Sequence, residues 1–387
     1  MNMKFVVAKA DLMKKLTLAM GNVSTKNTVP AIEGILIETV ENGKIQITTY
    51  DMQKGLRSLI TPTEVEREGR YIINAQRLYQ TVRVLPDDDI TIDINENLNC
   101  TISSGRAVFS MSATRGADYP NMPDLVTERG FTVGAENLRR MISKVTHSIA
   151  ISDNRPMLCG AYFSVNENGF EVVSCDSFRL SRCSLDCEIS TLSREGITNY
   201  SFIIPGTSLG EMMKILADGE DEVVKVYLSR KHVIVNKGDM TFFSRLIDSE
   251  YLDYKKIIPN ANNIVVKVDR DRLLMGLERA NIIAEEKIQG AGRSYVKIEI
   301  DGHYLNLTSN SGNGAVKDEM DCEHEGGPIE IAFNCRYLID AIKAAEGEQV
   351  LIRLKSHDSA ITIEPAEEVD NFKYFYMVLP RRTVENR

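Results

Sequence analysis

Long apolar runs are missing from the sequence. No stretch approaches the ~20 apolar residues that a membrane-spanning helix needs. The first residues, MNMKFVVAKADLMKKL, alternate and then carry charge at helical spacing, unlike a signal peptide. Paired cysteines are also missing: the sequence has seven cysteines, an odd number, and their spacing shows no pairs. They fit free thiols in a reducing compartment. We therefore expect a cytoplasmic protein with no membrane partner.

Catalytic and metal-binding motifs are missing as well. The five histidines are scattered, and neither G-x-S-x-G nor H-E-x-x-H occurs. Cys322 and His324 resemble half of a metal site, but no second pair follows at zinc-site spacing. The glycine-rich stretch QGAGRS (289–294) precedes an expected strand, whereas a phosphate-binding loop precedes a helix. We expect no enzyme, no metal and no cofactor; a hydrolase that uses the Cys322/His324 region is the alternative.

The length and the charge set two further bounds. A chain of 387 residues exceeds what one hydrophobic core usually organises, so two or three domains are expected. The net charge of −9 argues against a nucleic-acid partner unless positive charge gathers on one surface. The distribution of charge along the chain therefore decides this point.

The chain repeats one plan three times. Leu12, Leu138 and Leu273 each follow an alternating segment and open an apolar helical pattern, and they are 126 and 135 residues apart. A hairpin signal follows each of them, at Asn42-Gly43, Asn168-Gly169 and Asp301-Gly302. Markers that agree on one period predict three similar domains.

The second half of each third repeats too. The segments 71–85, 202–216 and 331–345 each read as a short strand that runs into an amphipathic helix, with further strands after it. Asp118-Tyr119 and Asp253-Tyr254, each with a proline within the next few residues, close the first two thirds. We predict an α+β fold with domains at 1–127, 128–260 and 261–387, each with two helices.

Positive charge concentrates on the expected helices. The segments 9–20, 74–85, 135–149, 207–216, 269–283 and 334–345 together carry +7, so the rest of the chain carries −16 to reach the total of −9. Helices at equivalent positions around an axis would bring this charge to one surface. Such a surface suits the phosphates of duplex DNA, held without base readout. The basic residues lack an aromatic ladder, so single-strand recognition is less favoured.

Across nearly its full length the sequence resembles the bacterial DNA polymerase III β subunit, the sliding-clamp family. The resemblance rests on TVPAIEGILIE (28–38), GADYPNMP (116–123), CDSFRLSR (175–182), IDSEYLDYKKIIP (247–259) and YMVLPRR (376–382). It implies the DNA clamp fold: three domains, each with two helices and two antiparallel β-sheets. It further implies that two chains close head to tail into a ring.

The resemblance implies a processivity factor without chemistry of its own. Such a ring encircles double-stranded DNA, slides without sequence specificity and tethers its partners. The implied partners are the α subunit of the replicative DNA polymerase, the clamp loader, and repair polymerases and ligase, all bound through short clamp-binding peptides. The implied location is the cytoplasm, in association with the nucleoid. A stationary duplex binder that recognises one site is a third hypothesis.

The resemblance assigns three sets of residues. The implied partner-peptide pocket comprises Leu158, Cys175, Ser177, Phe178, Arg179, Leu180, Leu252, Lys256, Ile257, Met377, Leu379, Pro380 and Arg381. The implied DNA contacts are Lys26, Arg77, Arg83 and Ser152, to which the charge distribution adds Arg139, Arg140 and Lys144. The implied dimer interface comprises Phe109, Ile282 and Ile283.

The chain departs from the family pattern at the pocket. The family commonly has Thr-Asp-x-His-Arg-Leu where this chain has the run Cys175 to Leu180. Leu252 stands where proline is usual, and Leu379-Pro380-Arg381 replaces a methionine-rich ending. In the second domain, PGT (205–207) replaces a basic pair, and the last residues, TVENR, extend beyond the usual end. We expect the pocket to be present with an altered peptide preference.

Overall fold

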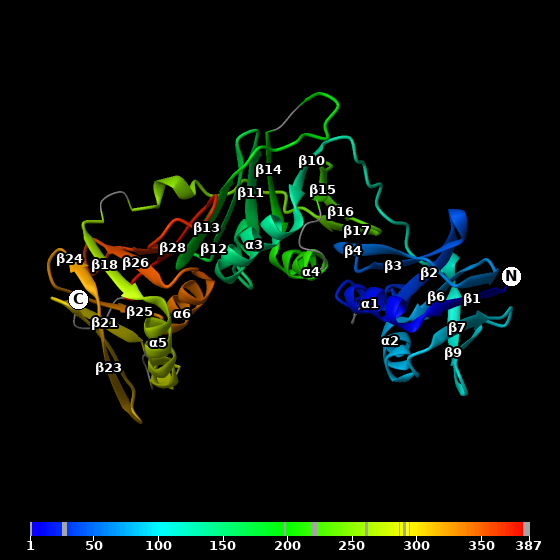
Figure 1. Cartoon of the computed structure of the whole chain (residues 1–387), viewed down its shortest axis with the longest axis horizontal. Helices are drawn as coiled ribbons and strands as arrows, with labels where there is room; N and C mark the ends of the chain where they lie inside the picture. The colour runs from blue at the N-terminus through cyan, green and yellow to red at the C-terminus, as the bar shows by residue number, and fades with distance from the viewer. Residues whose placement is uncertain are drawn as a thin grey trace. The chain divides into compact units, whose positions relative to one another are not determined.

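A computed structural model describes residues 2–24, 29–196, 199–217, 223–259, 262–285, 287–288, 292–293 and 295–381 (Figure 1). The chain divides into two compact units. The first unit comprises Met1–Arg139, Ser190–Thr198 and Thr207–Leu246, and the second comprises Arg140–Ile189, Asn199–Gly206 and Ile247–Arg387. The middle third of the chain contributes to both units, so the borders near residues 127 and 260 stay a prediction.

Six α-helices occur in the described part of the chain, two in each predicted third. They are α1 (Lys9–Met20), α2 (Ala75–Val84), α3 (Ala135–Val145), α4 (Gly206–Leu216), α5 (Arg270–Ala284) and α6 (Cys335–Ala344). Asn74, Asp269 and Asn334 cap α2, α5 and α6, since each side chain accepts a backbone N–H of the first turn. The prediction of two helices per third is confirmed.

One antiparallel sheet of 13 strands runs through the first unit, in the order β10-β15-β16-β17-β4-β3-β2-β6-β9-β8-β7-β1-β5. The strands are β1 (Met3–Ala8), β2 (Gly34–Val40), β3 (Lys44–Tyr50), β4 (Lys54–Ile60), β5 (Glu64–Arg67), β6 (Arg70–Asn74), β7 (Asp89–Ile94), β8 (Asn99–Ser104), β9 (Ala107–Arg115), β10 (Gly130–Gly134), β15 (Val223–Leu228), β16 (His232–Lys237) and β17 (Met240–Arg245). Strand β9 joins two parts of the sheet, because it pairs with β8 along most of its length and with β6 only through its last three residues.

The core of the N-terminal third lies between its two helices and its strands. Leu12 and Leu16 of α1 share one buried cluster with Leu78 and Val82 of α2 and with apolar residues of β1, β2, β3, β6, β7 and β8. The spacing of three to four residues puts these side chains on one face of each helix. The helices α1 and α2 lie against each other (Figure 1). The helical pattern read from the sequence is therefore the pattern of the core.

The second unit holds a nine-stranded, a four-stranded and a two-stranded antiparallel sheet. Their orders are β14-β11-β12-β13-β28-β27-β26-β18-β24, β23-β22-β21-β25 and β19-β20. The strands are β11 (Gly160–Asn166), β12 (Gly169–Cys175), β13 (Arg179–Asp186), β14 (Tyr200–Pro205), β18 (Ile264–Asp269), β19 (Lys287–Ile288), β20 (Gly292–Arg293), β21 (Val296–Asp301), β22 (Tyr304–Asn310), β23 (Ala315–Asp321), β24 (Glu323–Glu325), β25 (Ile329–Phe333), β26 (Gln349–Leu354), β27 (Ile361–Pro365) and β28 (Phe372–Val378).

Two strand pairs cross the predicted domain borders. In the first unit β4 pairs with β17, with Ser58 opposite Met240. In the second unit β13 pairs with β28, with Leu180 opposite Met377. Ladder hydrogen bonds therefore join neighbouring thirds of the chain within each unit, and the strand edges at these borders are paired rather than exposed.

The three predicted hairpins are present. They connect β2 to β3, β11 to β12 and β21 to β22. Asn42, Gly43 and Gly302 have φ of 65°, 67° and 59°, the left-handed conformation that Asn and Gly adopt most readily. Two of the three signals thus mark turns with residues in this conformation, whereas Asn168 and Gly169 do not have positive φ.

The repeated Asp-Tyr segments end in buried tyrosines. Tyr119 follows a short helix, η3 (Gly116–Asp118), and packs in a cluster with Tyr50 and Phe243 of the first unit. Tyr254 opens the short helix η6 (Tyr254–Lys256) and packs with Leu158 and Met377 in the second unit. Each tyrosine anchors the connecting segment against a core, which accounts for the repetition.

Candidate functional site

Four residues of the predicted partner pocket share one apolar cluster in the second unit. Leu158, Cys175, Leu180 and Met377 are all buried there, and Leu252 packs at the edge of the cluster. They come from a short helix, η5 (Pro156–Cys159), from the end of β12, and from the paired strands β13 and β28. The β13–β28 ladder therefore builds the floor of the site from two distant parts of the sequence.

Large apolar side chains remain exposed beside this floor. Phe178 is 58% exposed, Ile257 46% and Leu379 40%. The backbone N–H of Leu379 donates to the carbonyl oxygen of Phe178 at 2.9 Å, so these two residues are neighbours. An exposed apolar group next to a buried apolar floor is typical of a surface that binds a partner.

Arg179 is held within the protein. Its guanidinium donates to Asp176 at 2.9 Å and to Asp340 of α6 at 2.8 Å, and it lies 4.4 Å from the centre of the Tyr337 ring. The ring of Phe178 stacks on the same tyrosine, with centroids 6.4 Å apart. Two residues of α6 thereby fix the rotamers of two pocket residues.

The turn that contains Ser177 has an unusual backbone. Ser177 has a φ of 79°, a conformation that costs energy for a residue other than glycine. Its hydroxyl accepts a hydrogen bond from Arg155, and its N–H donates to Cys175 Sγ at 3.4 Å. Burial raises the pKa of the Cys175 thiol, so this side chain acts as an apolar part of the floor.

Three further pocket residues lie at the basic rim. Lys256 is exposed and pairs with Asp253 at 2.8 Å. The backbone N–H of Arg381 donates to Ala332 at 2.7 Å, and its guanidinium lies 5.7 Å from the Tyr295 ring centre. Pro380, between Leu379 and Arg381, is half-buried.

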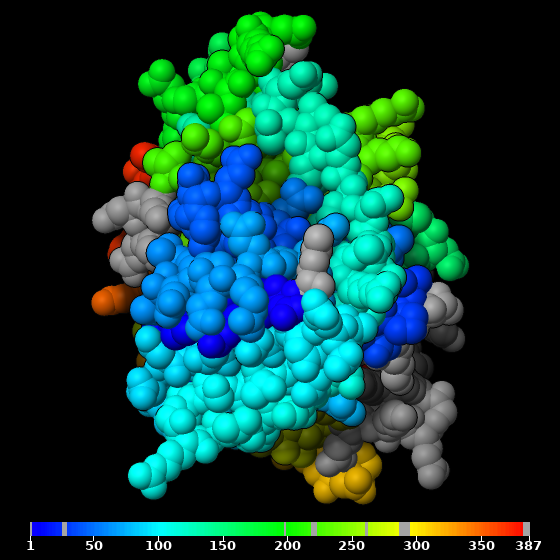
Figure 2. Space-filling view, turned by 90° about the vertical axis from the view of Figure 1, so that its right-hand side faces the viewer, coloured from blue at the N-terminus to red at the C-terminus, as the bar shows by residue number. Residues whose placement is uncertain are grey.

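The exposed face of α2 is positive and carries no acid. Arg77 and Arg83 are exposed, and neither forms an ion pair with another described residue. Gln76, Gln80 and Val84 complete the exposed face, while Leu78 and Val82 are buried. The exposed face of α2 can therefore approach an anion without first breaking an ion pair. The blue and cyan segments of the N-terminal third face the viewer in Figure 2.

The other predicted DNA contacts lie in different surroundings. Ser152 is exposed in the loop beside Ile151, which is also exposed. Lys26 lies outside the described residues. Arg139 is partly exposed and binds both carboxylate oxygens of Glu136, at 2.7 Å each.

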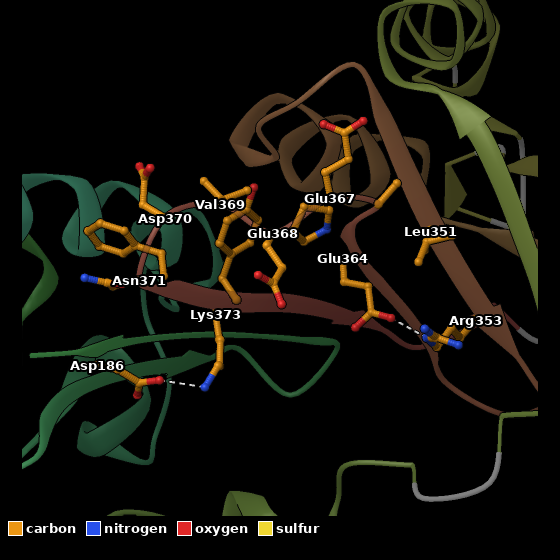
Figure 3. A pocket seen from close by; sticks show the side chains of 14 residues that line it. Asp186, Leu351, Arg353, Glu364, Glu367, Glu368, Val369, Asp370, Asn371 and Lys373 are labelled. Atoms are coloured by element: carbon orange, nitrogen blue, oxygen red, sulfur yellow. Dashed lines mark hydrogen bonds and ion pairs between the residues drawn. The ribbon is translucent and has the colours of Figure 1, made fainter.

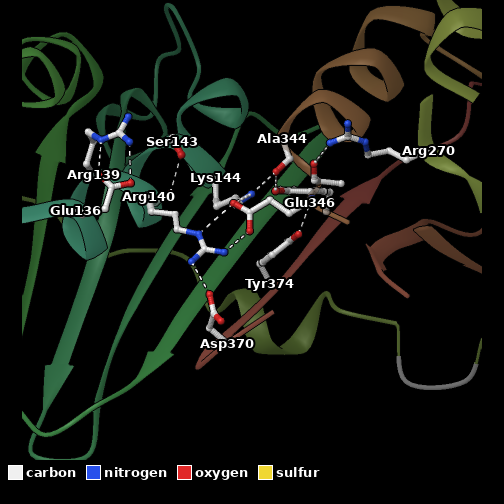
Figure 4. Close-up of polar contacts among 12 residues, drawn as sticks. Glu136, Arg139, Arg140, Ser143, Lys144, Arg270, Ala344, Glu346, Asp370 and Tyr374 are labelled. Atoms are coloured by element: carbon white, nitrogen blue, oxygen red, sulfur yellow. Dashed lines mark hydrogen bonds and ion pairs between the residues drawn. The ribbon is translucent and has the colours of Figure 1, made fainter. Parts of the chain in front are cut away.

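Arg140 and Lys144 of α3 are engaged in a partly buried network in the second unit (Figure 4). Arg140 pairs with Glu346 and, at 3.0 Å, with Asp370. Lys144 is 5% exposed in its side chain and lies 2.6 Å from Glu346 Oε1. Burial lowers the pKa of Lys144, while the hydrogen bond with Glu346 raises the pKa of Arg140. Their charges are neutralised within the unit.

The predicted dimer contacts lie beside unpaired strand edges. Phe109 on β9 is 38% exposed, Ile282 on α5 is 72% exposed, and Ile283 is half-buried. Among the described residues, positions 107–112 of β9 pair only with β8, and β23 pairs only with β22. Helix α5 packs on β22 and β23. Each unit thus carries an open edge next to exposed apolar side chains.

The region suggested for a metal or a hydrolase offers little chemistry. Cys322 is buried, and His324 lies on β24 opposite Val266 of β18. The described residues contain no group of three or more His, Cys, Asp or Glu side chains placed to hold a metal ion. Within the same part of the chain, every helix is too short or too polar to cross a membrane.

An open pocket of about 360 Å³ lies at the connection between β27 and β28 (Figure 3). Its lining includes Asp370, Phe372 and Tyr374, which contact Arg140 or Lys144. Charged residues line it, and four of them form two ion pairs. Lys373 binds Asp186 at 2.6 Å, and Arg353 binds Glu364. Both cations that line the pocket are therefore already paired with carboxylates.

Sequence reasoning missed the side chains that support the pocket. Tyr337 and Asp340 of α6 hold Phe178 and Arg179, and Arg155 holds Ser177. These residues belong to segments that read as an ordinary amphipathic helix and a polar loop. No local pattern distinguishes them, because their partners lie elsewhere in the chain.

The repeated pairs of helices on antiparallel sheets define the DNA clamp fold. The family models of the DNA polymerase III beta subunit match the chain along its length: the N-terminal domain at residues 3–123, the central domain at 132–253 and the C-terminal domain at 255–381. The chain belongs to the DNA polymerase III beta subunit family. The resemblance expected from the sequence is confirmed.

Individual relatives match over nearly their whole length. The beta sliding clamp of Pseudomonas aeruginosa (strain PAO1) is 28% identical over 382 residues, which cover 98% of this chain and 100% of that protein. The beta sliding clamp of Escherichia coli (strain K12) is 27% identical over the same length, with the same coverage.

Solved structures agree. The DNA polymerase III beta subunit of Thermotoga maritima superposes with a TM-score of 0.88 at 27% identity, covering 99% of this chain and 100% of that one. The sliding clamp of Pseudomonas aeruginosa bound to griselimycin superposes with a TM-score of 0.89 at 26% identity and the same coverage.

Proposed function

We propose that this chain is the processivity clamp of a bacterial replicase, a homodimeric ring around duplex DNA that tethers the polymerase. The observation that carries the proposal is the match of all three family domains, in order, over nearly the whole chain. The family comprises processivity factors, and its members hold DNA by topology rather than by chemistry. The proposed domains are 1–127, 128–260 and 261–387.

The DNA contact is proposed to rest first on α2. Arg77 and Arg83 are exposed, and the helix carries no acid that would neutralise them. Arginines that reach phosphates release counterions and read no bases, which permits sliding. Lys26, Ser152 and Arg139 remain proposed contacts, and Arg139 is bound to Glu136 in this structure.

Ring closure is proposed to occur between the open edge of β9 and that of β23. Exposed strand edges readily pair with another chain. Phe109 on one edge and Ile282 and Ile283 beside the other supply apolar surface for the contact. The two surfaces differ, so the contact is heterologous, and closure by two-fold repetition yields a ring rather than a filament.

The apolar cleft is proposed to bind short peptides of partner proteins. The floor built by Leu158, Leu180 and Met377 suits apolar anchors, and the basic rim suits an acidic flank. The proposed partners are the polymerase α subunit, the clamp loader, repair polymerases and ligase. The proposed location is the cytoplasm, at the nucleoid, and the proposed role requires no catalytic residue, metal or cofactor.

Primer extension tests this function. The cognate polymerase would copy primed single-stranded circular DNA with loader and ATP, and the product length per binding event would be measured. Adding the chain should lengthen the products by about tenfold or more, because tethering raises the effective concentration of the polymerase at the primer end. The double variant Phe178→Ala/Leu379→Ala should lose this gain, whereas Val223→Ala, at another exposed apolar residue, should keep it. Products that are equally long with and without the chain would refute the proposed function.

A further inference from the structure

We propose that Arg140, Lys144 and Glu346 form a positioning network that fixes α6, and through α6 the partner cleft, instead of contacting DNA. The inference rests on the proposed partner-binding function. It assigns a role to two basic residues of α3 that the charge pattern alone would place on the DNA surface. The residues of this network, helix α6 and the cleft residues that α6 contacts all belong to the second unit.

The network holds the C-terminal end of α6. Lys144 Nζ donates to the carbonyl oxygen of Ala344, the last residue of the helix, at 2.5 Å. Tyr376 Oη donates to the same oxygen at 2.9 Å. A cation at a helix C-terminus satisfies an open carbonyl and complements the helix dipole. Helix α6 is thereby attached to α3 and to β28.

Glu346 links the cations to the residues that follow the helix. Its carboxylate accepts from Arg140 Nε at 3.0 Å and from Lys144 Nζ at 2.6 Å, and its backbone N–H donates to Tyr374 Oη at 2.7 Å. Arg270 Nη1 donates to Ala345 at 2.9 Å (Figure 4). Side chains from α3, α5 and β28 therefore converge on the two residues after α6.

An aromatic ring lies against each of the two cations. The Lys144 ammonium lies 4.5 Å from the centre of the Tyr374 ring, and the Arg140 guanidinium lies 4.3 Å from that of Phe372. With only 5% of its side chain exposed, Lys144 cannot reach a phosphate without leaving this site. A buried charge that loses its partner is strongly unfavourable, so the network resists local opening.

Residues at the start and the middle of the same helix support the cleft. Tyr337 stacks with Phe178, and Asp340 binds Arg179 at 2.8 Å. Helix α6 is only ten residues long, about 15 Å, so a shift at one end is carried to the other. The network at Ala344 and the supports at Tyr337 and Asp340 thus act on one rigid element.

The decisive variant is Glu346→Gln, which removes the charge and keeps the side-chain size. The control is Glu136→Gln, which weakens the partly exposed pair with Arg139 on the same helix α3. Affinity would be measured by fluorescence anisotropy with a fluorescein-labelled synthetic decapeptide that carries two leucines and one phenylalanine as apolar anchors. Hydrogen exchange of α6 and of residues 177–181 would be followed in the same samples.

We expect Glu346→Gln to weaken peptide binding about tenfold, within the range of coupling between linked sites, and to speed exchange in α6 and residues 177–181. Glu136→Gln should change neither. The double variant Glu346→Gln/Lys144→Met leaves no unpaired charge at Lys144 but also loses the bond to Ala344, so it should bind the peptide no better than Glu346→Gln. Wild-type affinity in the double variant would show that the unpaired charge, and not lost positioning of α6, weakens binding.

If Glu346→Gln binds the peptide with wild-type affinity and its hydrogen exchange is unchanged, the proposed positioning role of the network is wrong. A wild-type chain that does not bind the peptide would instead contradict the proposed cleft, and the exchange of α6 would still decide whether the network fixes the helix. We also expect Lys144→Met to leave the salt dependence of DNA association unchanged. A smaller slope of log affinity against log salt in this variant would show that Lys144 contacts DNA.

Discussion

Lys144 and Glu346 form an ion pair of 2.6 Å although they stand in different thirds of the chain. The pair divides the basic residues of the helices into two groups. Lys144 and Arg140 are neutralised inside the second unit, whereas Arg77 and Arg83 on α2 are exposed without an ion pair among the described residues. Equal charge in the sequence therefore does not mean equal availability to DNA.

The first prediction concerns Arg77 and Arg83. The variant Arg77→Ala/Arg83→Ala should weaken association with a short duplex and lower the slope of log affinity against log salt by up to about two, one for each lost phosphate contact. Fluorescence anisotropy over a salt series measures this. The control is Arg230→Ala, at an exposed arginine after β15, and it should leave the slope unchanged. An unchanged slope in the double variant would show that these two arginines of α2 do not contact DNA.

The second prediction concerns the open edges of β9 and β23. A carboxylate introduced by Phe109→Asp or Ile282→Asp would be buried unpaired in a dimer interface, so either variant should shift the protein to a monomer. Sedimentation equilibrium measures the shift, and far-UV circular dichroism checks that the fold is kept. The control Met275→Asp changes another exposed apolar residue of α5 and should stay dimeric. Dimers of unchanged affinity in both variants would place the interface elsewhere.

The third prediction concerns His147, between Ser181 and the ring of Tyr376. Its Nε2 lies 3.0 Å from Ser181 Oγ, and the two rings meet edge to face at 5.2 Å. Burial lowers its pKa from 6.5 to about 4, and the nearby Arg179 lowers it further than Asp340 raises it, with Lys144 adding to the lowering. The folded chain therefore keeps this imidazole neutral.

The sign of the pH effect follows from this shift. Between about pH 6.5 and pH 4 the unfolded chain binds a proton that the folded chain does not, so stability is complete above pH 6.5 and falls as the pH drops to 4. The loss from this group should reach about 2–3 kcal/mol. Urea unfolding at pH 7, 6, 5 and 4 measures it. In His147→Gln the fall should be shallower by that amount, and an identical fall would exclude His147 as its source.

Local structure was predictable from the sequence because local chemistry determines it. The expected helix over 9–20 matches α1, and the Asn42-Gly43 signal matches a turn in which both residues have positive φ. The apolar spacing around Leu12 and Leu78 matches the buried faces of α1 and α2. These features depend on residues within one or two turns of each other.

Features that depend on distant partners were not predictable. Pairing of β4 with β17 and of β13 with β28 joins segments far apart in the sequence, and each strand alone has no mark of its neighbour. The burial of Lys144 depends on Glu346 and Tyr374, and the rotamer of Phe178 depends on Tyr337. The resemblance to a family identified the pocket residues as one set, but it did not identify α6 as the helix that supports them.

The central claim is that topology holds this protein on DNA, and one measurement tests it most directly. Labelled protein would be loaded on nicked circular plasmid by the cognate loader with ATP and isolated by gel filtration, and the plasmid would then be cut once. The account predicts that the protein stays on the circle and is lost after cutting, because a ring slides off a free end. Equal retention on the linear plasmid would show that contacts hold the protein and would contradict the ring.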